Sequence, residues 1–123
     1  MEKEPLRGVR VLELGSMAAG PFCGRLLGDF GADVIKVEQP EGDPGRYLGE
    51  HHKGVSLQGK SIMRNKKLIC VDLRTQEGQA LVQRLALKSD VIVENFRPGT
   101  LEKWGLGYQQ LSRLQPKTIM VRI

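Results

Sequence analysis

The sequence has few aromatic residues, two cysteines, two histidines and no long apolar run. Three Phe, two Tyr and one Trp make up 5% of the 123 residues, too few and too scattered for the stacking surfaces that bind single-stranded nucleic acid. The histidines are adjacent and the cysteines lie far apart, which is not the spacing of a metal site. No apolar run approaches the roughly 20 residues of a membrane-spanning helix. We therefore expect no metal, no nucleic-acid partner and no membrane span.

The charge is basic, with 19 Lys and Arg against 14 Asp and Glu and a formal net charge of +5. Such a surface attracts an anionic ligand or partner. The segment 1–8, MEKEPLRG, is polar and lacks the apolar stretch of a secretory signal. A cytoplasmic location and a single domain are the expectations.

The two cysteines are expected to be reduced, packed thiols. Cys23 falls in the predicted first turn of a helix, where a thiolate is favoured. It is therefore the better candidate for a reactive thiol than Cys70.

The segment 11–38 reads VLELGSMAAGPFCGRLLGDFGADVIKVE. It predicts a buried strand over 9–14, a small-residue turn over 15–20 and a second strand over 32–38. Between them a helix begins at Pro21, which suits the first helical position, and Gly31 caps its end. The apolar residues that recur at helical spacing are Phe22, Leu26, Leu27 and Phe30.

Residues 39–66 contain seven Gly and Pro and predict a long irregular connection, which is usually functional or mobile. Thr75 caps a predicted helix over 76–88, and its apolar face is assigned to Ala80, Leu81, Val82 and Leu85. Further strands are predicted at 68–73, 90–94 and 118–123, with helical segments at 100–104 and 108–114.

Five apolar strands separated by helices or long connections predict an α/β fold, with a Rossmann-like, mostly parallel sheet and flanking helices on both faces. The last segment, TIMVRI, reads as a buried strand with no partner after it, which leaves either an exposed edge or a missing neighbour. We expect one domain that is incomplete.

The first loop places free backbone N–H groups beside a helix N-terminus, which suits a phosphate or carboxylate. It is not the dinucleotide fingerprint G-x-G-x-x-G, because Met17 stands where the second glycine belongs. Glu38 occupies the place of a ribose-binding acid, which is weak evidence for NAD. A tight turn without any ligand is the alternative.

Other candidate ligands follow the later strands, because open α/β sheets bind ligands beyond the carboxyl ends of their strands. Arg74, Asn95 and Phe96 follow two of the predicted strands, and Lys103 and Trp104 come next. Cations beside an apolar or aromatic platform suit a phosphorylated adenosine. Core packing is the alternative for Trp104.

The glycine-rich connection contains two further charged candidates, Asp43 and Arg46. A local ion pair between them is the favoured interpretation, and contact of Arg46 with an anion is the alternative. His51 and His52 are expected to be solvated. No nucleophile with a nearby base, no HExxH and no GxSxG is present.

Three blocks of the sequence resemble one family. They are residues 11–46, VLELGSMAAGPFCGRLLGDFGADVIKVEQPEGDPGR, residues 65–79, NKKLICVDLRTQEGQ, and residues 90–119, DVIVENFRPGTLEKWGLGYQQLSRLQPKTI. Together they resemble the N-terminal segment of class III CoA-transferases, the CaiB/BaiF family. The resemblance implies a cytosolic two-domain protein that forms an interlocked homodimer and binds coenzyme A or acyl-CoA on its large domain. Residues 1–123 would be the N-terminal part of that domain.

The resemblance also implies which residues contact coenzyme A. These are Ser16, Met17, Ala18, Ala19, Gln39, Val71, Arg74, Asn95, Phe96, Lys103 and Trp104.

The implied reaction moves coenzyme A from an acyl-CoA to a carboxylic acid through a covalent aspartyl intermediate. The resemblance places that aspartate beyond Ile123. No catalytic residue is then expected within this chain, which would be inactive alone. A 2-methylacyl-CoA racemase of the same family and a non-catalytic nucleotide-binding module are the alternatives.

Overall fold

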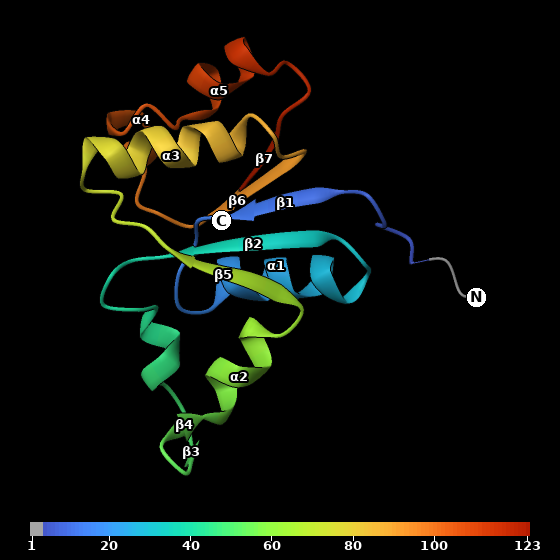
Figure 1. The fold of residues 1–123 in the computed structure, drawn as a ribbon, viewed down its shortest axis with the longest axis vertical. Coiled ribbons are helices and arrows are strands. Elements are labelled where there is room, and N and C mark those ends of the chain that lie inside the picture. The colour runs from blue at the N-terminus through green and yellow to red at the C-terminus, as the bar shows by residue number, and fades with distance from the viewer. Residues whose placement is uncertain (1–3) are drawn as a thin grey trace.

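A computed structural model describes residues 4–123, so Met1 to Lys3 of the charged segment 1–8 lie outside the described residues. Its centre is a five-stranded sheet in the order β5-β2-β1-β6-β7 (Figure 1). Every neighbouring pair in this sheet is parallel. This confirms the predicted α/β fold. The strands are β1 (Arg10–Glu13), β2 (Asp33–Glu38), β5 (Lys66–Cys70), β6 (Val91–Glu94) and β7 (Ile119–Arg122).

Helices cover both faces of the sheet, as predicted (Figure 1). One face carries α3 (Gln76–Ala86), α4 (Thr100–Lys103) and α5 (Tyr108–Leu114), and the opposite face carries α1 (Ala19–Asp29). The two faces have separate apolar cores, one around Leu12, Val82 and Ile92 and the other around Val11 and Val34. Alternate residues of β1 therefore enter opposite cores, as the pleat of a buried strand requires. No helix within residues 4–123 has the length and apolarity needed to span a membrane.

The connection between β2 and β5 is more regular than its composition suggested. It contains the 3₁₀ helix η1 (Pro44–Tyr47), the antiparallel hairpin β3 (His51–His52) and β4 (Val55–Ser56), and helix α2 (Leu57–Met63). The Ser56 hydroxyl accepts a hydrogen bond of 2.9 Å from the Gly59 amide and so caps α2. The strand predicted at 68–73 instead covers Lys66–Cys70.

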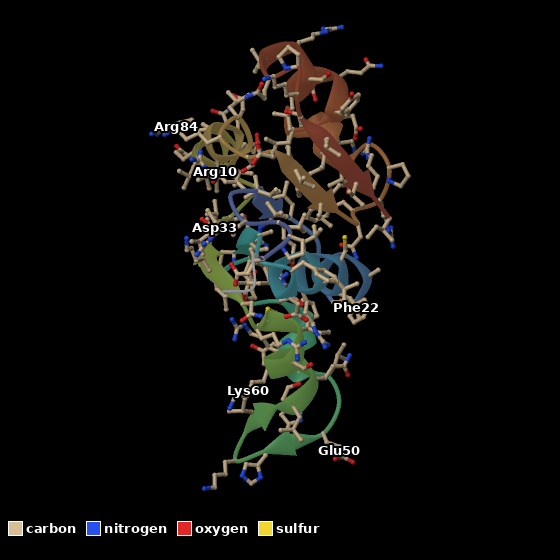
Figure 2. All side chains as sticks on the ribbon, turned by 90° about the vertical axis from the view of Figure 1, so that its right-hand side faces the viewer. Arg10, Phe22, Asp33, Glu50, Lys60 and Arg84 are labelled. Atoms are coloured by element: carbon tan, nitrogen blue, oxygen red, sulfur yellow. The ribbon has the colours of Figure 1, made fainter. Side chains whose placement is uncertain are left out.

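Helix α1 approaches the sheet through its small residues. Gly20, Pro21, Gly24 and Gly28 are the buried positions, whereas Phe22, Leu26 and Phe30 are 48%, 42% and 55% exposed. A Cβ at position 24 would collide with the Glu13 carboxylate, so the helix must present glycine there. Figure 2 shows Phe22 pointing away from the ribbon. Of the four apolar residues that recur at helical spacing, only Leu27 packs against the core, so the spacing alone did not identify the buried face.

Of the three helix boundaries predicted from capping residues, two are confirmed and one is wrong. Thr75 Oγ1 accepts from the Gly78 amide at 3.0 Å, which confirms the predicted start of α3. Gly31 follows α1 with a φ of 97°, a left-handed conformation that favours glycine, which confirms the predicted stop. The predicted start at Pro21 is wrong, because α1 begins at Ala19.

Two predictions of burial are wrong. On α3, Val82 and Ala86 are buried and Leu85 packs against the core, whereas Ala80 and Leu81 face solvent. Strand β7 lies at the edge of the sheet, and its Ile119 is 59% exposed. Within the described residues it pairs only with β6.

Candidate functional site

A cavity of about 90 Å³ opens at the edge of the sheet where the strands end. Loops after β1, β2, β5 and β6 all contribute to it, because parallel strands bring their carboxyl ends to the same edge. Six of the eleven predicted ligand residues line the cavity. They are Ser16, Gln39, Val71, Arg74, Phe96 and Trp104.

The aromatic wall of the cavity is a pair of rings. Phe96 and Trp104 meet edge to face, with centroids 5.4 Å apart and an interplanar angle of 81°. Both rings also pack against the core that contains Leu12 and Ile92. Trp104 therefore packs against the core, which confirms that interpretation of the sequence, and it also lines the cavity, where its role as a ligand-binding residue stays a prediction.

The first loop is tied to the loop after β6 by Asn95. The Ser16 amide donates to Asn95 Oδ1 at 2.8 Å, and Asn95 Nδ2 donates back to the Ser16 carbonyl at 3.0 Å. Asn95 thus fixes the loop backbone. Met17, Ala18 and Ala19 are exposed on the same loop and do not line the cavity.

Arg74 is the cation at the rim of the cavity. Its guanidinium contacts Asp72 at 2.8 Å and Glu41 at 3.0 Å. These hydrogen bonds raise the pKa of Arg74 above its usual value and lower the pKa of Asp72. Within residues 4–123 the Nη1 atom of Arg74 has no hydrogen-bond partner. The side chain is therefore oriented by two carboxylates and keeps donors for an anion.

The other two predicted polar ligands, Gln39 and Lys103, make fewer contacts within the described residues than Arg74 and Asn95 do. Gln39 Nε2 donates to the carbonyl of Gly42 at 3.1 Å. Lys103 is exposed near the end of α4, next to Trp104, and does not line the cavity.

Three strands that lead into the site end on buried glutamates. Glu13, Glu38 and Glu94 are the last residues of β1, β2 and β6, and are 0%, 7% and 2% exposed. The sequence alone indicates a role only for Glu38. The signal for the other two was available, because each is a charged residue at the end of an otherwise apolar strand.

Glu38 is bound by Arg46. The guanidinium donates to both carboxylate oxygens, at 2.7 and 2.6 Å, and the amide of Asp43 donates to one of them at 3.0 Å. The hydrogen bonds from Arg46 hold the pKa of Glu38 below its usual value. The predicted ion pair between Asp43 and Arg46 is therefore wrong, because the bidentate contact with Glu38 satisfies the arginine fork better.

Glu94, the last residue of β6, also accepts hydrogen bonds from a backbone amide and from an arginine. It accepts from the Phe96 amide at 2.8 Å and from Arg122 at 2.6 Å. Arg122 also contacts Glu102 of α4 at 2.6 Å. The turn that presents Asn95 and Phe96 is thereby fixed to the edge strand and to α4.

A buried ionic cluster lies beneath the first loop. Lys36 Nζ is 3.0 Å from Glu13 and 2.8 Å from Asp43, and it donates to the Gly15 carbonyl at 2.8 Å. Lys66 contacts the second oxygen of Glu13 at 2.6 Å. Burial opposes ionisation of Asp43, but the hydrogen bonds from Lys36 and from two backbone amides outweigh it and lower its pKa. Burial lowers the pKa of Lys66, because its effect is larger than that of the hydrogen bond with Glu13, which raises the pKa.

Two expectations for the cysteines are wrong, one on the packing of Cys70 and one on the ionisation of Cys23. Cys70 is exposed rather than packed. Burial, followed by the nearby charge of Glu13, raises the pKa of Cys23. The predicted favoured thiolate at Cys23 is therefore wrong, because the residue lies on the side of α1 that approaches the sheet.

The histidines lie in the β3–β4 hairpin, and both are exposed, in agreement with the solvated state expected for them. Among residues 4–123 no group of three or more His, Cys, Asp or Glu side chains could hold a metal ion.

Comparison with known proteins yields a consistent match. The model of the family described as CoA-transferase family III matches residues 6–123. The chain is 60% identical over 121 residues to the succinyl-CoA–D-citramalate CoA-transferase of Chloroflexus aurantiacus, covering 97% of this chain and 30% of the relative. It is 43% identical over 122 residues to the human succinyl-CoA:glutarate CoA-transferase, covering 98% of this chain and 28% of the relative.

Solved structures agree. A CaiB/BaiF family protein from Brucella suis superimposes with a TM-score of 0.86 at 42% identity, over 98% of this chain and 33% of the solved chain. A hypothetical protein from Mycobacterium tuberculosis, Rv3272, gives the same values. The chain thus spans about a third of the length of these proteins.

Proposed function

This chain belongs to CoA-transferase family III, and from that premise we propose that residues 4–123 form the coenzyme A-binding part of an enzyme that moves coenzyme A from an acyl-CoA to a carboxylic acid. One observation carries the proposal. The cavity at the strand ends combines an aromatic pair, Phe96 and Trp104, with a cation, Arg74, whose remaining donors are available. This chemistry suits the adenine and phosphates of coenzyme A.

The acyl group is proposed to be a short dicarboxylate. Relatives of this chain are named for transfer between succinyl-CoA and D-citramalate, L-malate or glutarate. Their shared donor supports succinyl-CoA as the first acyl-CoA to examine.

The reaction is proposed to need an aspartate outside these 123 residues. All five aspartates of the chain already have a structural partner. Asp29 pairs with Arg64, Asp33 with Lys67, Asp43 with Lys36 and Asp72 with Arg74, and Asp90 accepts from the Arg10 amide. Only Asp43 and Asp72 border the cavity, and each is bound there to a cation, Lys36 or Arg74. This supports a division in which the present residues bind the carrier, and no metal enters the proposal.

The proposal extends to a cytoplasmic homodimer. The exposed Phe22 and Leu26 of α1, together with Phe30 just after its end, support association, since soluble monomers rarely expose neighbouring large apolar side chains. Sedimentation velocity of the protein tests this part, and a monomer at micromolar concentration would contradict it.

Titration calorimetry with coenzyme A tests binding directly. The protein is expected to bind, and Arg74→Ala is expected to weaken binding by about 1–3 kcal/mol, the usual loss for a charged donor. Arg84→Ala is the matched control, because Arg84 is exposed on α3 and does not line the cavity (Figure 2). If the well-folded protein binds neither coenzyme A nor succinyl-CoA, the non-catalytic module becomes the better interpretation.

A further inference from the structure

The loop after β1 contains a residue in a conformation that side chains rarely adopt. Met17 has a φ of 65°, in the left-handed region. Its side chain is 46% exposed, so packing of that side chain does not hold the backbone there. Another interaction must stabilise this conformation.

That interaction comes from Asp43. The Met17 amide donates to Asp43 Oδ1 at 3.0 Å, and the same oxygen accepts from the Gly45 amide at 2.7 Å. Asp43 Oδ2 lies 2.8 Å from Lys36 Nζ. Because Lys36 also donates to the Gly15 carbonyl at 2.8 Å, one ion pair binds the loop backbone at two positions.

This pair is buried and rigidly supported. Lys36 is fully buried within β2 and also contacts Glu13, and Asp43 is 2% exposed. A buried ion pair is often no more stabilising than apolar residues of similar size, so its presence calls for a further role. The geometry here indicates that the role is to determine the conformation of the loop.

We propose that Asp43, anchored by Lys36, is a positioning residue that holds Met17 in its left-handed conformation and so keeps the preceding Gly15 and Ser16, which line the cavity, in the shape that receives coenzyme A. This inference rests on the proposed function. Asp43 also borders the cavity, but its negative charge would repel a phosphate. It therefore acts through the Met17 backbone, and a loop shaped in advance lowers the ordering cost of binding.

Substitutions at Met17 test the backbone requirement without disturbing the buried cluster. A β-branched side chain disfavours the left-handed region much more strongly than an unbranched one. In calorimetry with coenzyme A, Met17→Val is expected to bind about tenfold more weakly than Met17→Leu, because leucine, like methionine, is unbranched at Cβ. The position is exposed, so both variants are expected to fold.

A double-mutant cycle tests whether Asp43 acts through Met17. Asp43→Ala is expected to weaken coenzyme A binding about tenfold alone, and less than about threefold in the Met17→Gly background, because glycine adopts a positive φ without help. Asp33→Ala is the matched control. Asp33 is exposed at the opposite end of β2, where it pairs with Lys67 (Figure 2).

The outcomes separate this inference from the proposed function. Absence of coenzyme A binding by the unsubstituted protein would overturn the proposed function. Binding that is unaffected by Asp43→Ala, or a loss that persists fully in the Met17→Gly background, would overturn the positioning role alone. If Asp43→Ala does not fold, the comparison of Met17→Val with Met17→Leu decides, and equal affinities would overturn the role.

Discussion

Asn95 and Ser16 are 79 positions apart in the chain and are joined by two reciprocal hydrogen bonds. The Ser16 amide donates to Asn95 Oδ1 at 2.8 Å, and Asn95 Nδ2 donates to the Ser16 carbonyl at 3.0 Å. Since Ser16 follows β1 and Asn95 follows β6, the pair connects the ends of two adjacent strands. An asparagine side chain here completes the backbone pairing that the strands no longer provide.

Removal of this connection is expected to destabilise the fold. Asn95→Ala leaves a partly buried donor and acceptor of Ser16 without partners, which typically lowers the free energy of unfolding by about 1–3 kcal/mol. Gln109→Ala is the control, because Gln109 is exposed on α5 and such changes usually stay within about 0.5 kcal/mol. Urea unfolding followed by circular dichroism measures both. Equal midpoints for the two variants would show that the pair does not contribute.

The buried ammonium of Lys36 is expected to contribute more to stability than the exposed ammonium of Lys67. Lys36→Met leaves Glu13 and Asp43 buried with less compensating charge, and is expected to lower the free energy of unfolding by about 3–5 kcal/mol. Lys67→Met removes a pair whose side chains are 68% and 49% exposed, and the expected change is about 1 kcal/mol or less. Lys36 lies in β2, and Lys67 lies in β5, the neighbouring edge strand of the same sheet. Similar losses in urea unfolding would contradict the importance of the buried cluster.

Stability is expected to fall with acid because of Glu38 and Asp43. Hydrogen bonds in the folded state lower the pKa of both carboxyl groups. A carboxyl group whose pKa is lowered by folding contributes its whole stabilising free energy at pH values above its unfolded-state pKa of about 4. That contribution is lost as the pH falls through the folded-state pKa. Urea midpoints should therefore be steady between pH 7 and about 5 and should fall below about pH 4. Glu38→Gln is expected to flatten this fall, and an unchanged pH profile for that variant would refute the assignment to Glu38.

The two thiols are expected to react at different rates. Cys70 is exposed, whereas burial and the charge of Glu13 raise the pKa of Cys23. At pH 8 we expect alkylation of Cys23 by iodoacetamide to be slower by about tenfold or more. Peptide mass spectrometry of a time course measures both rates, and Cys70→Ser should abolish the fast phase. Comparable rates for the two sites would mean that Cys23 is more accessible than the structure shows.

Local signals in the sequence were sufficient for most elements. The predicted helix over 108–114 matches α5, and the caps at Thr75 and Gly31 lie where expected, because a cap depends on residues within one turn of it. The strand ends also brought Ser16, Arg74 and Phe96 to one cavity. A parallel sheet guarantees this convergence from the order of elements alone.

The sequence by itself determined the α/β architecture, the edge of the sheet at which the cavity opens, and the family resemblance. Only the tertiary structure decided which face of α1 is buried and which charges pair. Arg46 lay nearer in sequence to Asp43 but binds Glu38, and Lys36 joins Glu13 to Asp43 across two strands and a loop. Periodicity and capping act over a few residues, whereas burial and ion pairing depend on neighbours that only the folded chain brings together.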